Sequence, residues 1–223
     1  SLKSNAIVKK FGELSNDINE LSKFDVVLYA GSLGKFFRNN INDFDGNQYI
    51  FPPEKKIEEF NVRFNQLPLK YKIGISWKSY KNRYSKEKSL ELKDFENIFK
   101  NKECNFINLQ YGESEGEVNK FNLANNNKII NLNDQDIYND FESLSAILAN
   151  LDLFITVSNS TAHLAGSVGV KTILIKPSNH AVYHYWNQLN NKTPWYKSLT
   201  LVDKEDFLNK KINLLEMINN NDL

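Results

Sequence analysis

Apolar residues follow two different spacings along this chain, which predicts strands and helices in alternation. Short apolar runs of strand length occur at residues 71–77, 105–109, 151–156 and 172–176. Between the strand-like runs, apolar residues recur every three or four positions, most clearly at residues 141–151, as in an amphipathic helix. Strands that alternate with helices form parallel sheets, so we predict an α/β fold, a Rossmann-like parallel sheet with helices on both faces.

Weaker patterns predict the remaining elements of this region. They comprise helices near 92–99, 117–124 and 208–218, and strands at 128–132 and 198–202.

Residues 1–70 have a different pattern, with helices predicted at 7–21 and 54–67 and a single strand at 25–30. One strand cannot form a sheet, so residues 1–70 cannot make a complete domain of this class, and we predict that residues 71–223 form the main domain. The sequence begins with Ser-Leu-Lys and contains one methionine, Met217. We interpret this as the loss of the natural start by processing, tag removal or truncation.

The most informative motif is VSNSTAHLAGSVG, at residues 157–169. It stands between two predicted strands and reads as a polar turn followed by a short helix of small residues. The N-terminus of such a helix binds anions, because its backbone N–H groups are unpaired and its dipole end is positive. We therefore predict an anion site, and a phosphate as its ligand. Its candidate residues are Ser158, Asn159, Ser160, Thr161 and His163.

A basic segment follows the strand predicted at 71–77. It contains Lys78, Lys81, Arg83, Lys86 and Lys88. Most residues in such a segment are solvated, but cations at the edge of a sheet also suit a diphosphate. We select Lys88 as the ligand-facing residue, because it immediately precedes the segment that leads into the next helix.

Composition and charge exclude several classes of function. The formal net charge is +1, which gives no basis for nucleic-acid binding. No apolar run approaches the roughly 20 residues of a membrane span, and we identify no signal peptide. The one cysteine, Cys104, cannot form an internal disulfide, so we expect a cytoplasmic protein.

Acidic triplets occur at residues 43–45 and 134–136, and they are similar to the Asp-x-Asp metal site of some sugar transferases. Neither has a third ligand at a recognisable spacing, so we predict no bound metal and no cofactor. His180 and His184 lie among aromatic residues and could line a cleft, although aromatic residues in such a position are typical of packing.

Several motifs together resemble the C-terminal half of a two-lobed (GT-B) glycosyltransferase, of the heptosyltransferase-like kind found behind tetratricopeptide repeats. They cover most of residues 71–202. In chain order they are GISWKS, the basic segment ending in Lys-Ser-Leu, INLQYGE, the stretch from NDFESLSAIL to SVGVKT, and TPWYKSLTL.

The resemblance implies a nucleotide-diphosphate sugar as donor, bound at residues 71–223, with its diphosphate at the SNSTAH helix end and Lys88 against the leaving diphosphate. It also implies that the acceptor and the catalytic base belong to the N-terminal lobe, of which residues 1–70 resemble only the last part, so we expect a truncated chain. The acceptor (a glycan, a lipid-linked sugar or a protein) and the catalytic residue stay unknown. Heptosyltransferases often carry aspartate where this chain has Ser158.

Two alternatives stay open. A nucleotide- or phosphate-binding module without transfer activity would have the same anion site. A two-lobed epimerase or phosphorylase would share the architecture. The epimerase would need acidic and basic groups from both lobes, and the phosphorylase would need a lysine that binds pyridoxal phosphate. From residues 1–223 we expect donor binding with weak transfer at most.

Overall fold

The computed structural model describes residues 22–80, 84–126, 129–178, 182–186, 190–209 and 216. Its contacts divide the chain into two compact units, Ser1–Phe44 and Asp45–Leu223. This division lies upstream of residue 70, where the sequence pattern placed a boundary. The helix predicted at 7–21 lies outside the described residues, as does most of the helix predicted at 208–218.

The described part of the first unit contains short helical turns, η1 (Ala30–Ser32), α2 (Gly34–Phe37) and η2 (Ile41–Asp43). Residues 26–29 have no regular structure, and their side chains are 48–75% exposed. The strand predicted at 25–30 is therefore wrong. A strand needs a hydrogen-bonded neighbour, and the described residues of this unit include no other strand.

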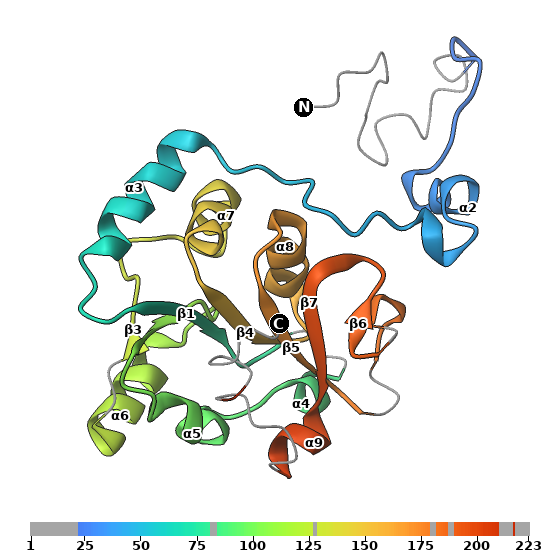
Figure 1. Ribbon diagram of the computed structural model, residues 1–223. Coiled ribbons are helices and arrows are strands. Elements are labelled where there is room, and N and C mark those ends of the chain that lie inside the picture. Colours follow the sequence, from blue (N-terminus) through green and yellow to red (C-terminus); the bar gives the residue numbers. More distant parts are fainter. Residues whose placement is uncertain are drawn as a thin grey trace. The chain divides into compact units, whose positions relative to one another are not determined.

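The second unit is built on a seven-stranded sheet in the order β3-β2-β1-β4-β5-β7-β6 (Figure 1). All neighbouring strands are parallel except β6 and β7, which are antiparallel. The strands are β1 (Tyr71–Ser76), β2 (Cys104–Asn108), β3 (Ile129–Ile130), β4 (Leu153–Val157), β5 (Thr172–Lys176), β6 (Lys192–Thr193) and β7 (Tyr196–Asp203). This confirms the predicted Rossmann-like sheet. From β1 the chain adds β2 and β3 on one side of the sheet and then β4 and β5 on the other, so the strand order reverses between β1 and β4. Ligands of such folds bind beside the carboxyl ends of the strands at that point.

Helices cover both faces of the sheet, as predicted (Figure 1). One face carries α3 (Glu54–Asn65), α7 (Phe141–Ala149) and α8 (Ser160–Val168). The other carries η3 (Leu92–Phe95), α5 (Glu96–Phe99), α6 (Glu115–Asn125) and α9 (Lys204–Leu208). Within the part of the chain that the structure describes, no helix is both long and apolar enough to cross a membrane.

Helix α3 belongs to the sheet-bearing unit because it packs on α7. Phe60 and Phe64 are 1% and 2% exposed and lie in the same core cluster as the apolar face of α7. The Lys56 ammonium also bonds the Asp140 carboxylate (2.9 Å) at the start of α7. Asp140 caps that helix by accepting from the Ser143 backbone N–H at 2.9 Å.

Candidate functional site

The turn between β4 and α8 is fixed by the Asn159 side chain. Asn159 precedes α8, and its Oδ1 accepts from the Ala162 backbone N–H at 3.0 Å, which is an N-cap. Its Nδ2 donates to the Ser76 hydroxyl at 2.9 Å, at the end of β1. The start of α8 is therefore held against the carboxyl end of the neighbouring strand.

Ser158 and Thr161 are buried, whereas Ser160 is exposed. The Ser158 hydroxyl accepts from the Trp186 indole N–H at 2.9 Å. Trp186 belongs to the short turn η4 (His184–Trp186). The polar side chains at the start of α8 thus differ in their surroundings, and Ser158 is bonded to a second segment.

His163 lies one turn into α8 and is enclosed by aromatic rings. The Trp186 ring stacks on its imidazole with centroids 4.5 Å apart and an interplanar angle of 23°. Its Nδ1 lies 3.0 Å from the Tyr196 hydroxyl. Burial, together with the nearby charge of His184, lowers the pKa of His163 to about 4, so the imidazole is neutral at physiological pH.

A close approach of backbone and ring makes this arrangement possible. A Cβ on Gly166 would lie 2.4 Å from the Tyr196 ring, so only glycine leaves room for that ring against α8. The glycine in the middle of this helix therefore has a packing role.

Lys88 is the last residue of the short helix α4 (Ser85–Lys88), and it is 2% exposed. Its ammonium lies 4.2 Å from the centre of the Tyr183 ring. Among the described residues it has no carboxylate within 4.0 Å and no side-chain hydrogen bond. A buried cation that lacks an anion is costly, and an anionic ligand would remove that cost.

The end of α4 is held by Lys204 of α9. The Lys204 ammonium donates to the backbone carbonyls of Lys86 and Glu87, each at 3.1 Å, and to that of Ser89 at 2.5 Å. Helix ends leave such carbonyls unpaired, so Lys204 acts as their cap and fixes the backbone from which Lys88 projects.

The other cations of the basic segment are placed differently. Lys78 pairs with Glu117 of α6 at 2.5 Å, and Lys86 is exposed. Lys81 and Arg83 lie outside the described residues. Of the three cations of this segment that are described, only Lys88 is buried.

Residues 182–186 bring three of the candidate residues together. Tyr183 contacts Lys88, and Trp186 contacts both Ser158 and His163. The sequence analysis interpreted the aromatic residues here as packing, and Trp186 is indeed 1% exposed in a core cluster. It missed that the same rings orient polar groups of the site. The signal in the sequence that could have identified these residues is the group of aromatic residues that follows the strand predicted at 172–176.

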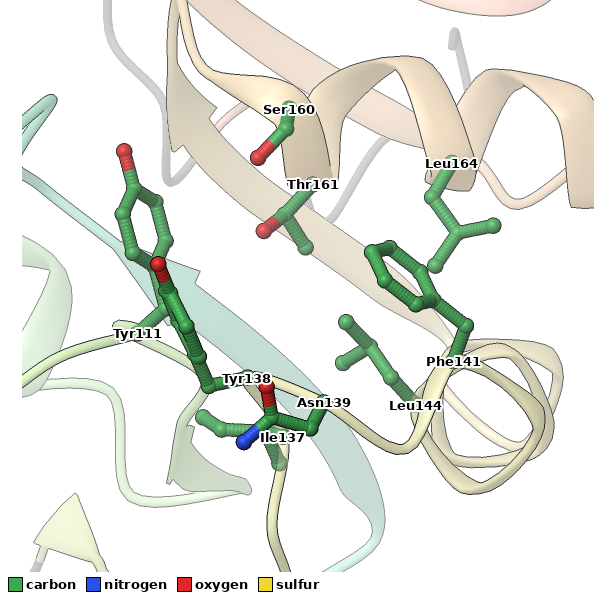
Figure 2. Close-up of a pocket in the computed structure, with 9 residues that line it drawn as sticks. All are labelled: Tyr111, Ile137, Tyr138, Asn139, Phe141, Leu144, Ser160, Thr161 and Leu164. Atoms are coloured by element: carbon green, nitrogen blue, oxygen red, sulfur yellow. The ribbon is translucent and has the colours of Figure 1, made fainter. Parts of the chain in front are cut away.

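A pocket of about 400 Å³ opens beside the start of α8 (Figure 2). Tyr111 and Tyr138 form one wall, with ring centroids 6.3 Å apart. The complete lining is Tyr111, Ile137, Tyr138, Asn139, Phe141, Leu144, Ser160, Thr161 and Leu164. Of these, the sequence analysis named only Ser160 and Thr161 as site residues. Tyr111, Ile137, Tyr138 and Asn139 come from loops, Phe141 and Leu144 from α7, and Leu164 from α8 itself.

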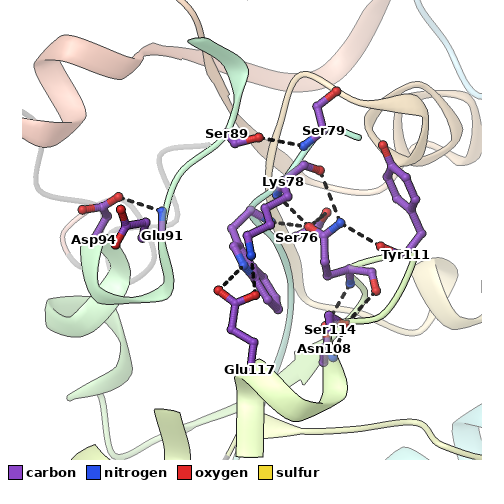
Figure 3. A network of polar contacts seen from close by, with 12 residues as sticks. Ser76, Lys78, Ser79, Ser89, Glu91, Asp94, Asn108, Tyr111, Ser114 and Glu117 are labelled. Atoms are coloured by element: carbon purple, nitrogen blue, oxygen red, sulfur yellow. Dashed lines mark hydrogen bonds and ion pairs between the residues drawn. The ribbon is translucent and has the colours of Figure 1, made fainter. Parts of the chain in front are cut away.

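The Gln110 side chain connects the pocket residue Tyr111 to Ser76, which contacts the α8 turn. Figure 3 shows Ser76, Lys78 and Tyr111 close together in this polar network. The Gln110 Oε1 accepts from the Ser76 hydroxyl (3.1 Å) and from the backbone N–H groups of Trp77 (2.9 Å) and Lys78 (2.7 Å). Its Nε2 donates to the Tyr111 carbonyl at 3.0 Å. Because Ser76 also accepts from Asn159, one chain of hydrogen bonds fixes the ends of β1 and β2 and the start of α8.

The acidic triplets have structural partners. Asp134 forms a two-point ion pair with Arg63 (2.8 and 2.9 Å), which lowers the pKa of that carboxyl to about 2. Asp43 accepts from the backbone N–H groups of Asn39 and Asn40. Within the described ranges, no three His, Cys, Asp or Glu side chains gather as a metal site would require.

Two further histidines and the cysteine remain. His180 lies outside the described residues, and His184 is exposed beside Tyr185. Cys104 is buried in the core, where burial raises the pKa of its thiol to about 11.

Comparison with known proteins agrees with this geometry at the level of the fold. No family model matches the chain. Over 165 residues the chain is 26% identical to protein FlbA of Caulobacter vibrioides. The aligned region covers 72% of this chain and 26% of FlbA.

Solved glycosyltransferase structures share the fold. A glycosyl transferase family 9 protein from Veillonella parvula aligns with a TM-score of 0.54 and 17% identity, over 74% of this chain and 45% of that protein. The ADP-heptose LPS heptosyltransferase II of E. coli aligns with a TM-score of 0.54 and 10% identity, over 84% and 59% of the two chains. The chain has a heptosyltransferase-like glycosyltransferase fold. It spans about half of each of these two structures.

Proposed function

We propose that this chain binds the nucleotide-diphosphate sugar donor of a glycosyltransferase. The observation that carries the proposal is the buried Lys88 ammonium, which has no carboxylate partner among the described residues and contacts the segment that bonds Ser158. A diphosphate would supply the missing negative charge. The unpaired N–H groups at the start of α8 would add hydrogen bonds to the same anion.

The aromatic pocket suits the nucleoside part of such a donor. Ser160 and Thr161 belong both to the start of α8 and to the pocket wall, so a ligand anchored there by its diphosphate can extend toward Tyr111 and Tyr138 (Figure 2). Aromatic rings offer flat apolar faces to a base, and Tyr138 is accessible at 63% exposure.

In the transfer reaction, the bond between the sugar and the diphosphate breaks, and negative charge develops on the leaving diphosphate. A fixed cation and helix N–H groups that already point at this charge stabilise the transition state. We assign this role to Lys88 and to the start of α8. Since these groups neutralise the diphosphate themselves, we further propose that binding does not depend on a divalent metal.

Thermal unfolding with nucleotides tests the proposal. We expect one of ADP, GDP, UDP and CDP to stabilise the protein by about 2.7 kcal/mol at 100 times its dissociation constant, relative to the ligand-free protein. This stabilisation should exceed that by the corresponding monophosphate at the same concentration. The same stabilisation is expected in EDTA and in Mg²⁺. Unfolding curves that are the same with each of the four diphosphates, at millimolar concentration, as without ligand would contradict the proposal.

Lys204 should matter for this binding although it is expected not to touch the ligand. The Lys204→Met variant keeps the aliphatic stem but leaves three carbonyls around α4 without their donor. We expect roughly fivefold to tenfold weaker diphosphate binding by calorimetry, about 1 kcal/mol, because Lys88 is no longer held in place.

Lys93→Met is the matched control, since Lys93 is exposed and pairs with Glu91 on the surface. It should bind the diphosphate as the unmodified protein does. Equal affinity of the Lys204 and Lys93 variants would show that the end of α4 needs no cap to position Lys88.

A further inference from the structure

Two cations of helix α3 bond the two ends of the segment 134–140. The Arg63 guanidinium donates to both carboxylate oxygens of Asp134, at 2.8 and 2.9 Å. The Lys56 ammonium donates to the Asp140 carboxylate at 2.9 Å. Lys56 and Arg63 are seven positions apart, about two helical turns, so both side chains project from the same face of α3. The segment is therefore attached to α3 at its first and its last residue.

The middle of the segment is closed by the Asp136 side chain. Its Oδ1 accepts from the backbone N–H groups of Tyr138 (3.1 Å) and Asn139 (3.0 Å), and its Oδ2 accepts from Asn139 Nδ2 (2.8 Å). The hydrogen bond from the Asn139 side chain lowers the pKa of the Asp136 carboxyl, so at neutral pH it is an acceptor only. The Asp140 backbone N–H also donates to the Asp136 carbonyl at 2.9 Å. These bonds form a closed turn between the two attached ends.

This turn supplies Ile137, Tyr138 and Asn139 to the pocket lining, and Figure 2 shows the three along one edge of the pocket. Ile137 is partly buried against the core cluster that contains Phe60 and Phe64 of α3. Tyr138 is exposed, by contrast, and residues 131–140 belong to neither β3 nor α7. Regular backbone pairing therefore does not fix the Tyr138 wall, and its place depends on the bonds to α3.

We propose that Arg63 and Lys56 are positioning residues, which hold the turn 134–140 so that Tyr138 and Asn139 form the wall that takes the nucleoside part of the donor. The choice of ligand rests on the proposed function, whereas the role of α3 in holding the turn does not. The acidic triplet 134–136 serves the pocket in this way through an ion pair and hydrogen bonds.

Hydrogen exchange in the ligand-free protein tests the attachment of the turn. Exposed ion pairs contribute little to overall stability, so Arg63→Met should leave the melting temperature nearly unchanged. The effect is expected locally, at the bonded backbone amides of Gln135, Tyr138, Asn139 and Asp140. We expect these amides to exchange about tenfold faster in the variant, because the turn opens more often.

Lys55→Met is the matched control, since Lys55 is exposed on the same helix. It should leave the exchange of the turn unchanged. If the four amides exchange in Arg63→Met as they do in the unmodified protein, α3 does not hold the turn and the inference is wrong.

Calorimetry with two probes tests the ligand. The probes are the nucleoside diphosphate that stabilises the protein best and inorganic pyrophosphate, which lacks the nucleoside. In Arg63→Met we expect the nucleoside diphosphate to bind roughly fivefold more weakly, about 1 kcal/mol, and pyrophosphate to bind as it does to the unmodified protein. A purely structural role would weaken both probes alike, and such a result would overturn the proposal. Unchanged affinity for the nucleoside diphosphate would overturn it too.

Charge reversal shows whether the ion pair is the cause. Arg63→Asp places two carboxylates together, so nucleoside diphosphate binding should be weaker than in Arg63→Met. Adding Asp134→Arg to Arg63→Asp restores opposite charges, and we expect it to recover most of the affinity. A double variant that binds no better than Arg63→Asp would count against the pair.

The two proposals fail in different ways. If the unmodified protein binds neither the nucleoside diphosphates nor pyrophosphate, the proposed function is wrong, and so is the ligand assigned to this wall. The exchange rates of the ligand-free protein then still decide whether Arg63 holds the turn.

Discussion

Lys88→Met is expected to make the ligand-free protein more stable and to weaken diphosphate binding at the same time. The substitution removes a buried charge that has no carboxylate partner among the described residues, and methionine fills a similar volume. An unmet buried polar group costs about 1–3 kcal/mol, and a cation over an aromatic ring recovers part of that cost. We expect a net gain in unfolding free energy of about 1 kcal/mol.

Binding should change in the opposite direction. The loss of a charge-assisted contact costs about 1.5–3 kcal/mol, which corresponds to roughly 10-fold to 150-fold weaker affinity. Denaturant unfolding and calorimetry with the nucleoside diphosphate that stabilises the protein best measure the two effects.

Lys86→Met is the matched control, because Lys86 is exposed and belongs to the same short helix. It should change neither quantity appreciably. If the Lys88 variant loses stability and keeps its affinity, then Lys88 is a packing residue and the proposed diphosphate site is wrong.

Trp186→Ala should have the largest effect on stability. Trp186 is 1% exposed and packs with Ala162, Leu174 and Tyr196. Truncation of such a side chain leaves a cavity and costs about 3–5 kcal/mol. It also removes the ring stacked on His163 and the donor to Ser158, so diphosphate affinity should fall further than stability alone explains.

Two other variants separate these effects. Trp77→Ala removes a tryptophan that is 0% exposed in a different core cluster, so it should destabilise the protein comparably and retain diphosphate affinity where the protein is folded. Trp186→Phe keeps a ring but loses the N–H, so it should bind more weakly with a smaller loss of stability. Equal affinities in the two alanine variants would show that Trp186 serves the core only.

The sequence was sufficient to predict the sheet and the helix that begins the site. Strands β1, β2, β4 and β5 and helix α8 are close to their predicted positions, because apolar spacing within an α/β unit depends on local residues. The strand at 25–30 was wrong for the opposite reason. Its apolar residues resemble a strand, but pairing depends on a partner that spacing cannot supply.

The site could be predicted only where it lies in one continuous motif. Ser158, Asn159, Ser160, Thr161 and His163 were chosen because they follow a predicted strand and begin a helix, and Lys88 because it precedes the segment that leads into the next helix. Their role in binding stays a prediction. The aromatic segment 182–186, the Tyr138 wall and the cap provided by Lys204 were missed. Each of these comes from a distant part of the chain, and side chains that meet only through the tertiary fold leave no periodic signal.

The buried thiol has a practical consequence for experiments on this protein. Cys104 is the one cysteine in the sequence, and a pKa of about 11 leaves on the order of one thiol in a thousand or fewer ionised near neutral pH. Thiolate is the form that reacts with maleimides and iodoacetamides. A cysteine introduced on the surface can therefore carry a fluorophore or spin label selectively, with the native residue left in place.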